Sequence, residues 1–197
     1  FKQSGKPNEK QKLDEDDLYA EIIKMAENIQ PGADGLFFSP HLGGRICPSN
    51  SDMRGAWIGV SWSHTQAHFA RAILESIAFE YAWYLSILKE NLPWLKLSEA
   101  RAVGGGARSL VWNQIKADVL NVPYQRLKGN EFGAWGAAMI AGKAVGLIDN
   151  LADHAEKTAV VNGNALTPSS TNHALYQPLI SRYIEMESTL SHFFSNK

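Results

Sequence analysis

Cysteine is almost absent from this chain of 197 residues: Cys47 is the single one, so an internal disulfide is excluded. That scarcity is typical of a reducing cytoplasm, where we expect the protein to reside. Long apolar runs are also absent, since no stretch reaches the roughly 18 residues of a transmembrane helix, and no membrane partner is predicted. The chain has 19 basic and 20 acidic residues, which gives a formal net charge of -1. A nucleic-acid partner, which requires a basic face, is therefore not expected.

The first residues lack a starting Met and the apolar core of a signal peptide. Residues 1–5 are typical of the end of a helix, with Gly5 suited to a left-handed cap. We therefore expect a fragment whose preceding residues are absent; a processed mature N-terminus is the alternative. Residues 6–14 are polar and are predicted to form a surface loop.

Helical and extended patterns alternate along the chain, which predicts an α/β fold with some parallel strand pairing. The longest helix should cover residues 65–90, and its wide apolar surface predicts a central position with neighbours on several sides. Other helices are expected at residues 16–29, 109–120, 132–145 and 178–194, the last with Pro178 in its first turn. Short strands are expected at residues 36–38, 101–103 and 123–127. Loops are expected at residues 39–55 and 150–172.

A triple glycine at 104–106 follows one of these strands and precedes a helix that Ser109 can cap. Because glycine has no Cβ, a ligand can approach the backbone closely there. The free N–H groups and the positive dipole end of the following helix favour an anion. The turn is therefore a candidate nucleotide-binding wall, and a packing turn without a ligand is an equal alternative.

Two common nucleotide motifs are not matched. Residues 104–109 lack the G-x-G-x-x-G spacing of dinucleotide-binding folds, and the glycines before Lys143 lack the P-loop spacing, with Ala144 in place of its Ser or Thr. The small residues of this second segment are interpreted as allowing close packing of their helix against neighbours: Gly133, Ala134, Gly136, Ala137, Ala138 and Ala141.

No residue has a sequence context that marks it as a catalytic group or a metal ligand. His64 and His68 have a spacing that can bind a metal, but without a further ligand nearby a capping or surface role is favoured. Cys47 has no evident base partner. Asp52 and Arg54 are expected to form and anchor a turn.

Three segments, in order, resemble the FGGY carbohydrate kinases. The sequence GAWIGV at 55–60, followed after seven residues by HFARAILE at 68–75, is similar to the second signature of that family. Residues 104–120 resemble its adenosine-site segment, and residues 133–138 resemble the small-residue helix that follows. The similarity covers roughly residues 36–146, and within the family the sequences of these segments are most similar to those of the xylulokinases.

The resemblance implies a ribonuclease H-like α/β domain of the actin, hexokinase and Hsp70 ATPase superfamily, truncated at its N-terminus. Residues 1–197 would be the nucleotide-binding C-terminal domain, incomplete at its N-terminus, of an enzyme that uses ATP and Mg²⁺ to phosphorylate a small sugar. D-xylulose is the first candidate; gluconate, ribulose, glycerol or a similar polyol are alternatives. The sugar-binding N-terminal domain, which would carry the catalytic base, is expected as a partner outside this chain, and a homodimer is left open. The isolated chain is therefore predicted to be inactive.

By the same resemblance, the nucleotide contacts fall on the glycine turn and the residues after it: Gly104, Gly105, Gly106, Ala107, Arg108, Ser109 and Leu110. Gly105 and Gly106 would face the adenine and ribose through their backbone. Arg108 is either a nucleotide contact or a solvated loop residue, and Ser109 is favoured as a helix cap over a phosphate ligand. Leu110 stands where some relatives have Asn, so only apolar contact is expected from it.

Residues 40–45 resemble the family's cleft-side sequence P-Y-L-x-G-E-R, with one position fewer. His41 replaces the aromatic residue and Gly44 replaces the acid, which weakens the expectation that an ion pair holds Arg45. Arg45 is a candidate cleft residue, with a structural role as an equal alternative.

Two other function classes fit parts of the sequence. One is a non-catalytic nucleotide-binding module that uses the actin-like fold as a switch. The other is a dinucleotide-dependent oxidoreductase, which the glycine spacing disfavours, as does the absence of an acidic residue at the end of the strand at 123–127.

Overall fold

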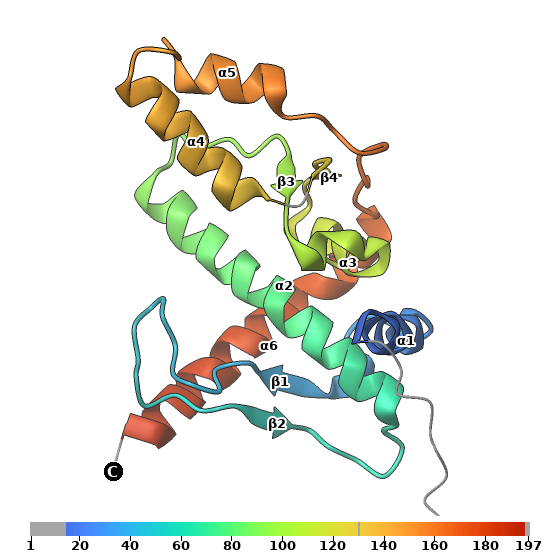
Figure 1. Ribbon diagram of the computed structural model, residues 1–197. Coiled ribbons are helices and arrows are strands. Elements are labelled where there is room, and N and C mark those ends of the chain that lie inside the picture. The colour runs from blue at the N-terminus through green and yellow to red at the C-terminus, as the bar shows by residue number, and fades with distance from the viewer. Residues whose placement is uncertain (1–14, 130, 196–197) are drawn as a thin grey trace, which may run out of the picture.

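The computed structural model describes residues 15–129 and 131–195, so the helix end expected at residues 1–5 and the loop at 6–14 lie outside the described residues. Helix α2 (Gln66–Asn91) is the central helix of the molecule (Figure 1). Packed against it are α1 (Glu15–Glu27), α3 (Leu110–Leu120), α6 (Ser170–Ser195) and β1 (Phe37–Ser39). The predicted long central helix with neighbours on several sides is confirmed.

A reciprocal cap starts α2. The backbone N–H of Thr65 donates to His68 Nδ1 at 3.1 Å, and the Thr65 hydroxyl lies 3.0 Å from the same nitrogen. His68 Nε2 also lies 3.1 Å from Asp34 Oδ2. The capping role favoured for His68 is confirmed, because the imidazole satisfies a backbone donor that the helix start leaves unpaired.

The strands form two small pairs. Strand β1 is antiparallel to β2 (Ala56–Ile58), with Phe38 opposite Trp57. Strand β3 (Ala100–Ala102) is parallel to β4 (Tyr124–Arg126), with α3 as the crossover. The predicted parallel pairing is confirmed. The loop between β1 and β2 contains the expected anchored turn, since Arg54 Nη1 donates to the carbonyls of Ser51 and Met53 at 2.8 and 2.7 Å.

The largest hydrophobic cluster lies where α2, α3 and α6 meet. Phe79 of α2 is at its centre, with its ring centroid 5.8 Å from that of Tyr176 and 5.3 Å from that of Tyr183, both on α6. All three side chains are almost completely buried, as are Ile115 and Val119 of α3. Burial of aromatic and branched side chains supplies the main stabilisation of this junction.

A buried ionic network crosses the same junction. Glu75 Oε1 accepts from Arg71 Nε at 2.7 Å and from the Tyr176 hydroxyl at 2.9 Å, and both Glu75 oxygens accept from the backbone N–H of Gly32. Arg71 Nη2 in turn donates to the Tyr176 oxygen at 2.7 Å. Gly32 has φ 92, and a Cβ there would lie 2.8 Å from Leu179 Cδ1, so only glycine suits this position. The network links the turn after α1 to α2 and α6.

Two sequence-based expectations about the C-terminal third are wrong. Residues 150–172 are not a continuous loop, because they contain α5 (Leu151–Thr158), which Asn150 caps by accepting from the N–H groups of Ala152 and Asp153. Helix α6 begins at Ser170 rather than at Pro178, which lies inside it. Pro178 removes one backbone hydrogen bond from the helix. We attribute the helical turns before Pro178 to the burial of Tyr176, which compensates for this loss.

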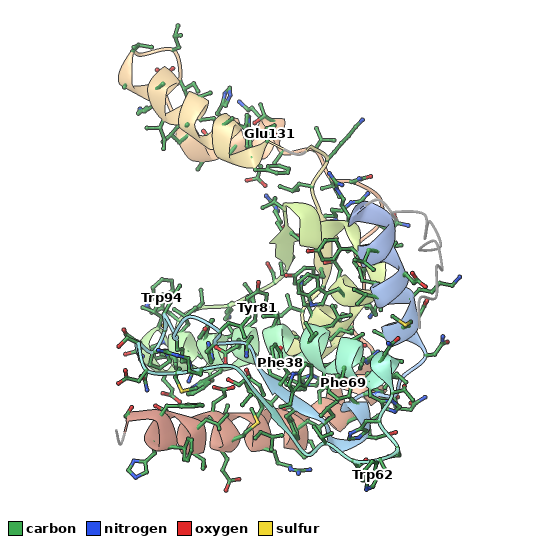
Figure 2. The ribbon with its side chains drawn as sticks, turned by 60° about the horizontal axis from the view of Figure 1, so that its bottom comes forward. Phe38, Trp62, Phe69, Tyr81, Trp94 and Glu131 are labelled. Carbon is green, nitrogen blue, oxygen red and sulfur yellow. The ribbon has the colours of Figure 1, made fainter. Side chains whose placement is uncertain are left out.

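The close packing expected for the small-residue helix is also wrong in this structure. Helix α4 (Phe132–Ala144) is described throughout, and none of its residues is buried. A Cβ added at Gly133 or Gly136 would meet no described atom within 4 Å. Helices α4 and α5 contact each other and project from the rest of the molecule as an arm, with Glu131 at its base (Figure 2). Across residues 15–129 and 131–195, no helix is both long and apolar enough to cross a membrane.

The buried network predicts a large and specific cost for neutralising Glu75. We expect Glu75→Gln to lower the free energy of unfolding by about 3–5 kcal/mol, because the buried Arg71 charge loses its counter-ion. Glu90→Gln, at an exposed position of the same helix, should change it by less than about 0.5 kcal/mol. Urea unfolding measures both. An unchanged stability for the Glu75 variant would show that the network is not ionic.

Candidate functional site

The triple glycine forms a tight turn between β3 and α3. Gly104 has φ 82 and precedes a short 3-10 turn, Gly105–Arg108. Asn113 of α3 donates from Nδ2 to the Ala107 carbonyl at 2.7 Å and fixes the turn from below. The Ser109 hydroxyl accepts from the N–H of Trp112 at 3.1 Å, so the helix-cap role favoured for Ser109 is confirmed.

The three glycines serve different purposes. A Cβ at Gly104 or Gly105 would meet no described atom within 4 Å, so the backbone faces open space at both positions. At Gly106 a Cβ would lie 2.8 Å from Cζ3 of Trp112. Trp112 is itself held by a hydrogen bond from Nε1 to the Leu74 carbonyl of α2, at 3.0 Å. Thus Gly106 is required for packing, whereas Gly104 and Gly105 leave the main chain accessible.

A cavity of about 310 Å³ adjoins this turn. It lies at the carboxyl ends of the parallel strands β3 and β4, the usual place for ligands in open parallel sheets. Its volume is at the lower end of the range for small-molecule sites. It is lined by Val103, Gly104, Ala107, Arg108, Arg126, Leu127, Gly129 and Asn162.

The far wall of the cavity comes from β4 and the segment beside it. The backbone N–H of Asn162 donates to the Arg126 carbonyl at 2.7 Å. With the Asn162 amide oriented so that its oxygen faces the guanidinium, that oxygen accepts from Arg126 Nε at 3.1 Å and also from Nη2. Arg108 and Arg126 thus place two positive charges in the lining, which suits an anionic ligand.

A buried lysine lies beneath the turn. Lys116 of α3 is 5% exposed, and its Nζ lies 3.8 Å from the centroid of the Trp112 ring and 5.8 Å from that of Tyr124. Burial lowers the pKa of Lys116 from 10.5 to about 8, because the charged ammonium is removed from water. Its positive charge therefore depends on pH in the mildly alkaline range.

The sequence-predicted residues divide around this geometry. Gly104, Ala107 and Arg108 line the cavity. The other predicted residues lie beside it without being part of its lining: Gly105, Gly106, Ser109 and Leu110, the last exposed at the start of α3. Sequence reasoning missed Arg126, Gly129 and Asn162. Arg126 and Gly129 could have been found, because parallel strands end at one edge of a sheet and the end of β4 must therefore lie beside the turn. Asn162 had no sequence signal.

Arg45 lies in a different cluster. Its side chain is buried, with Nη2 at 3.2 and 3.3 Å from the two oxygens of Glu80, and its guanidinium stacks 3.6 Å above the centroid of the Trp83 ring. Gly44 has φ 99, a conformation that disfavours a Glu at this position. The expectation that Arg45 lacks an ion pair is wrong, because Glu80 of α2 supplies the acid that the loop does not.

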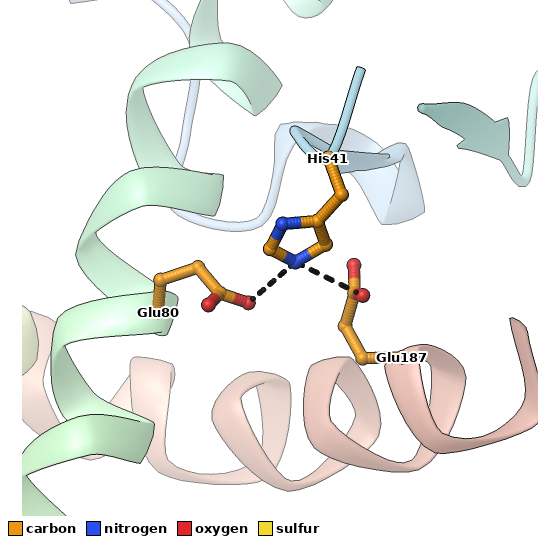
Figure 3. Close-up of side chains that lie close together, drawn as sticks. All are labelled: His41, Glu80 and Glu187. Carbon is orange, nitrogen blue, oxygen red and sulfur yellow. Dashed lines mark hydrogen bonds and ion pairs between the residues drawn. The ribbon is translucent and has the colours of Figure 1, made fainter. Parts of the chain in front are cut away.

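His41 completes this cluster between α2 and α6 (Figure 3). Its Nε2 lies 3.3 Å from Glu80 Oε1 and 3.3 Å from Glu187 Oε2. The Tyr183 hydroxyl donates to Glu80 Oε1 at 2.9 Å. Burial lowers the pKa of His41, but Glu187 and Glu80 raise it more, to about 9. Sequence reasoning did not predict this cluster, because its residues are far apart in the chain.

Comparison with known proteins identifies relatives that cover most of the chain. Residues 3–145 match the model of the FGGY family of carbohydrate kinases, C-terminal domain. A xylulose kinase of Staphylococcus epidermidis is 35% identical over 175 residues, which is 88% of this chain and 35% of that protein. A glycerol kinase of Acinetobacter baylyi is 37% identical over 133 residues, 67% of this chain and 26% of that protein. The crystal structure of gluconate kinase from Lactobacillus acidophilus superposes with a TM-score of 0.79 at 28% identity, covering 93% of this chain and 37% of that one.

The buried lysine predicts a pH dependence of stability. The pKa of Lys116 in the folded state is below its ordinary value. Between about pH 8 and 10.5 the unfolded chain therefore binds more protons at Lys116 than the folded chain does, so the free energy of unfolding increases as the pH rises through this window. Relative to Lys116→Met, the wild-type free energy of unfolding should increase by about 1–2 kcal/mol between pH 7.5 and 9.5. Urea unfolding at both pH values measures this difference, with Lys89→Met, at an exposed position, as the matched control. A constant difference across the window would show that Trp112 keeps the ammonium charged.

Proposed function

The chain belongs to the FGGY family of carbohydrate kinases, and we propose that it supplies the ATP-binding surface of an enzyme that phosphorylates a small sugar. The observation that carries this proposal is the accessible main chain of Gly104 and Gly105 beside a cavity with two arginines. An accessible backbone suits the flat face of a purine nucleoside, and the arginines suit its phosphates.

The family implies the fold of the actin, hexokinase and Hsp70 ATPases, and this chain is a mixed α/β part of it. The unit β3–α3–β4 supports a ribonuclease H-like arrangement, which is part of the proposal. In such an arrangement the glycine turn forms one wall of the nucleotide site. The rigid contacts of Asn113 and Trp112 hold that wall in place before a ligand arrives, which lowers the cost of binding.

Phosphoryl transfer requires mainly that the reactants be positioned and that charge on the transferred group be neutralised. Within this proposal the glycine turn holds the adenosine, and Arg108 and Arg126 attract the phosphates. A bound Mg²⁺ would share the negative charge of the phosphates. The catalytic base and the sugar site are assigned to the rest of a full-length kinase, because the chain spans about 35% of the xylulose kinase that it matches.

D-xylulose is the first candidate for the acceptor sugar. The support is the 35% identity to a xylulose kinase over most of the chain. The likenesses to a glycerol kinase and a gluconate kinase keep glycerol and gluconate as alternatives. The unburied residues of α4 support a further part of the enzyme that covers this helix.

Filling the open space at Gly105 should weaken nucleotide binding without affecting the fold. We expect Gly105→Ala to raise the dissociation constant for ATP roughly 10-fold or more, because the new methyl group would stand between the nucleotide and the backbone. Its stability should be unchanged, since no described atom lies within 4 Å of the added Cβ. Isothermal titration with ATP and thermal unfolding measure the two effects.

Gly136→Ala is the matched control for this experiment. Its added Cβ would likewise meet no described atom within 4 Å, but it lies in α4 rather than in the glycine turn. ATP affinity should equal that of the wild type, and stability should increase by up to about 1 kcal/mol because alanine favours helix. Equal ATP affinity in the Gly105 variant and the wild type would contradict the proposed site, as would tighter binding of NADH than of ATP.

The 197-residue chain should bind ATP without turning it over. With D-xylulose, gluconate or glycerol present, we expect no sugar-dependent release of ADP, because the general base is assigned to another part of the enzyme. A coupled assay for ADP checks this, with a full-length relative as the positive control. Sugar-dependent turnover by the isolated chain would show that the base lies within residues 1–197.

A further inference from the structure

We infer that a divalent transition-metal cation of the zinc type binds between His41, Glu80 and Glu187. The three side chains come from the loop after β1, from α2 and from α6, and all are buried, with exposed fractions of 8%, 3% and 0%. One donor atom from each lies within 4.8 Å of the other two. One imidazole nitrogen and two carboxylate oxygens are a ligand set that zinc accepts in proteins. The inference does not depend on the proposed nucleotide site.

The distances within the cluster favour a metal over a shared proton. His41 Nε2 is 3.3 Å from an oxygen of each carboxylate. A hydrogen bond between an imidazolium and a carboxylate is shorter, at about 2.7–2.9 Å, and one N–H can point at only one of the two oxygens. Ligand bonds of about 2.0–2.1 Å around a tetrahedral ion, by contrast, separate neighbouring ligand atoms by about 3.3–3.4 Å.

Glu187 gives independent support. Its side chain is completely buried and faces His41, whose Nε2 forms an ion pair with Oε2 at 3.3 Å (Figure 3), yet neither oxygen has a well-aligned hydrogen-bond donor among the described residues. A buried carboxylate without such partners is costly unless a cation compensates it. The guanidinium of Arg45 does not serve this purpose in the observed geometry, because it pairs with both oxygens of Glu80.

The neighbours of the cluster suit the support of a metal site. The Tyr183 hydroxyl and Arg45 Nη2 both donate to Glu80 Oε1, at 2.9 and 3.2 Å. Such outer contacts fix the orientation of a ligand and maintain its affinity for the metal. A bound ion would join the loop after β1 to α2 and α6, and its fourth ligand would come from outside these three side chains. A proton on His41 is the competing occupant.

Metal analysis of the 197-residue chain separates these two occupants. The chain is first freed of metal with a chelator, then incubated with Zn²⁺, and unbound Zn²⁺ is removed by gel filtration. We expect mass spectrometry to show one zinc per chain and the Tm to lie several degrees above that of the metal-free chain. Glu187→Gln keeps the shape of the side chain but removes its charge, and it should bind Zn²⁺ at least 10-fold more weakly. Glu185→Gln, at an exposed position of the same helix, should behave as the wild type.

Two results would overturn the inference. Absence of retained zinc and of a Tm change in the wild type would assign the site to a proton on His41. Equal zinc affinity in the wild type and the Glu187 variant would place the ion elsewhere. Should that variant not fold, the wild type loaded with Co²⁺ decides: we expect the visible absorption of a tetrahedral nitrogen and oxygen site. A sulfur-to-cobalt band would implicate the exposed Cys47 instead and refute the site.

Discussion

The arrangement of the molecule depends on the carboxylate of Glu75. This group is 1% exposed and accepts hydrogen bonds from a turn, from its own helix and from α6, through Gly32, Arg71 and Tyr176. Because a buried carboxylate is stable only while its donors stay in place, these three segments cannot shift independently. The network therefore fixes the register of α2 against α6, and α3 packs against both helices.

The glycine turn takes its position from the same part of α2. The Leu74 carbonyl, one residue before Glu75, accepts from Trp112 Nε1, and the Trp112 ring fills the space beneath Gly106. A chain of direct contacts thus connects the buried network to the wall of the candidate nucleotide site. The α4–α5 arm on the other side has no such support, since no residue of either helix is buried. One wall of the site is consequently held by contacts with α2, whereas no buried residue of α4 or α5 holds the arm.

The features that sequence reasoning predicted correctly are those that local patterns determine. The apolar periodicity of α2, the cap at Ser109 and the parallel strands around α3 each follow from residues close together in the chain. The start of α6 was missed, because Pro178 is a local stop signal that the burial of Tyr176 overrides. The ion pair of Arg45 with Glu80 was missed for a related reason: no local rule joins a loop residue to an acid on a distant helix turn.

The two buried ionic clusters are built alike along the contact of α2 with α6. In each, a glutamate of α2 accepts from a tyrosine of α6 and pairs with an arginine: Glu75 with Tyr176 and Arg71, Glu80 with Tyr183 and Arg45. In the first cluster the carboxylate of Glu75, the guanidinium of Arg71 and the hydroxyl of Tyr176 all have hydrogen-bond partners. The second cluster contains a further buried acid, Glu187, which the arginine of that cluster does not pair with. Glu187 therefore requires a positive charge that neither Arg71 nor Arg45 supplies, and the group beside it is His41, which can carry a proton or bind a cation.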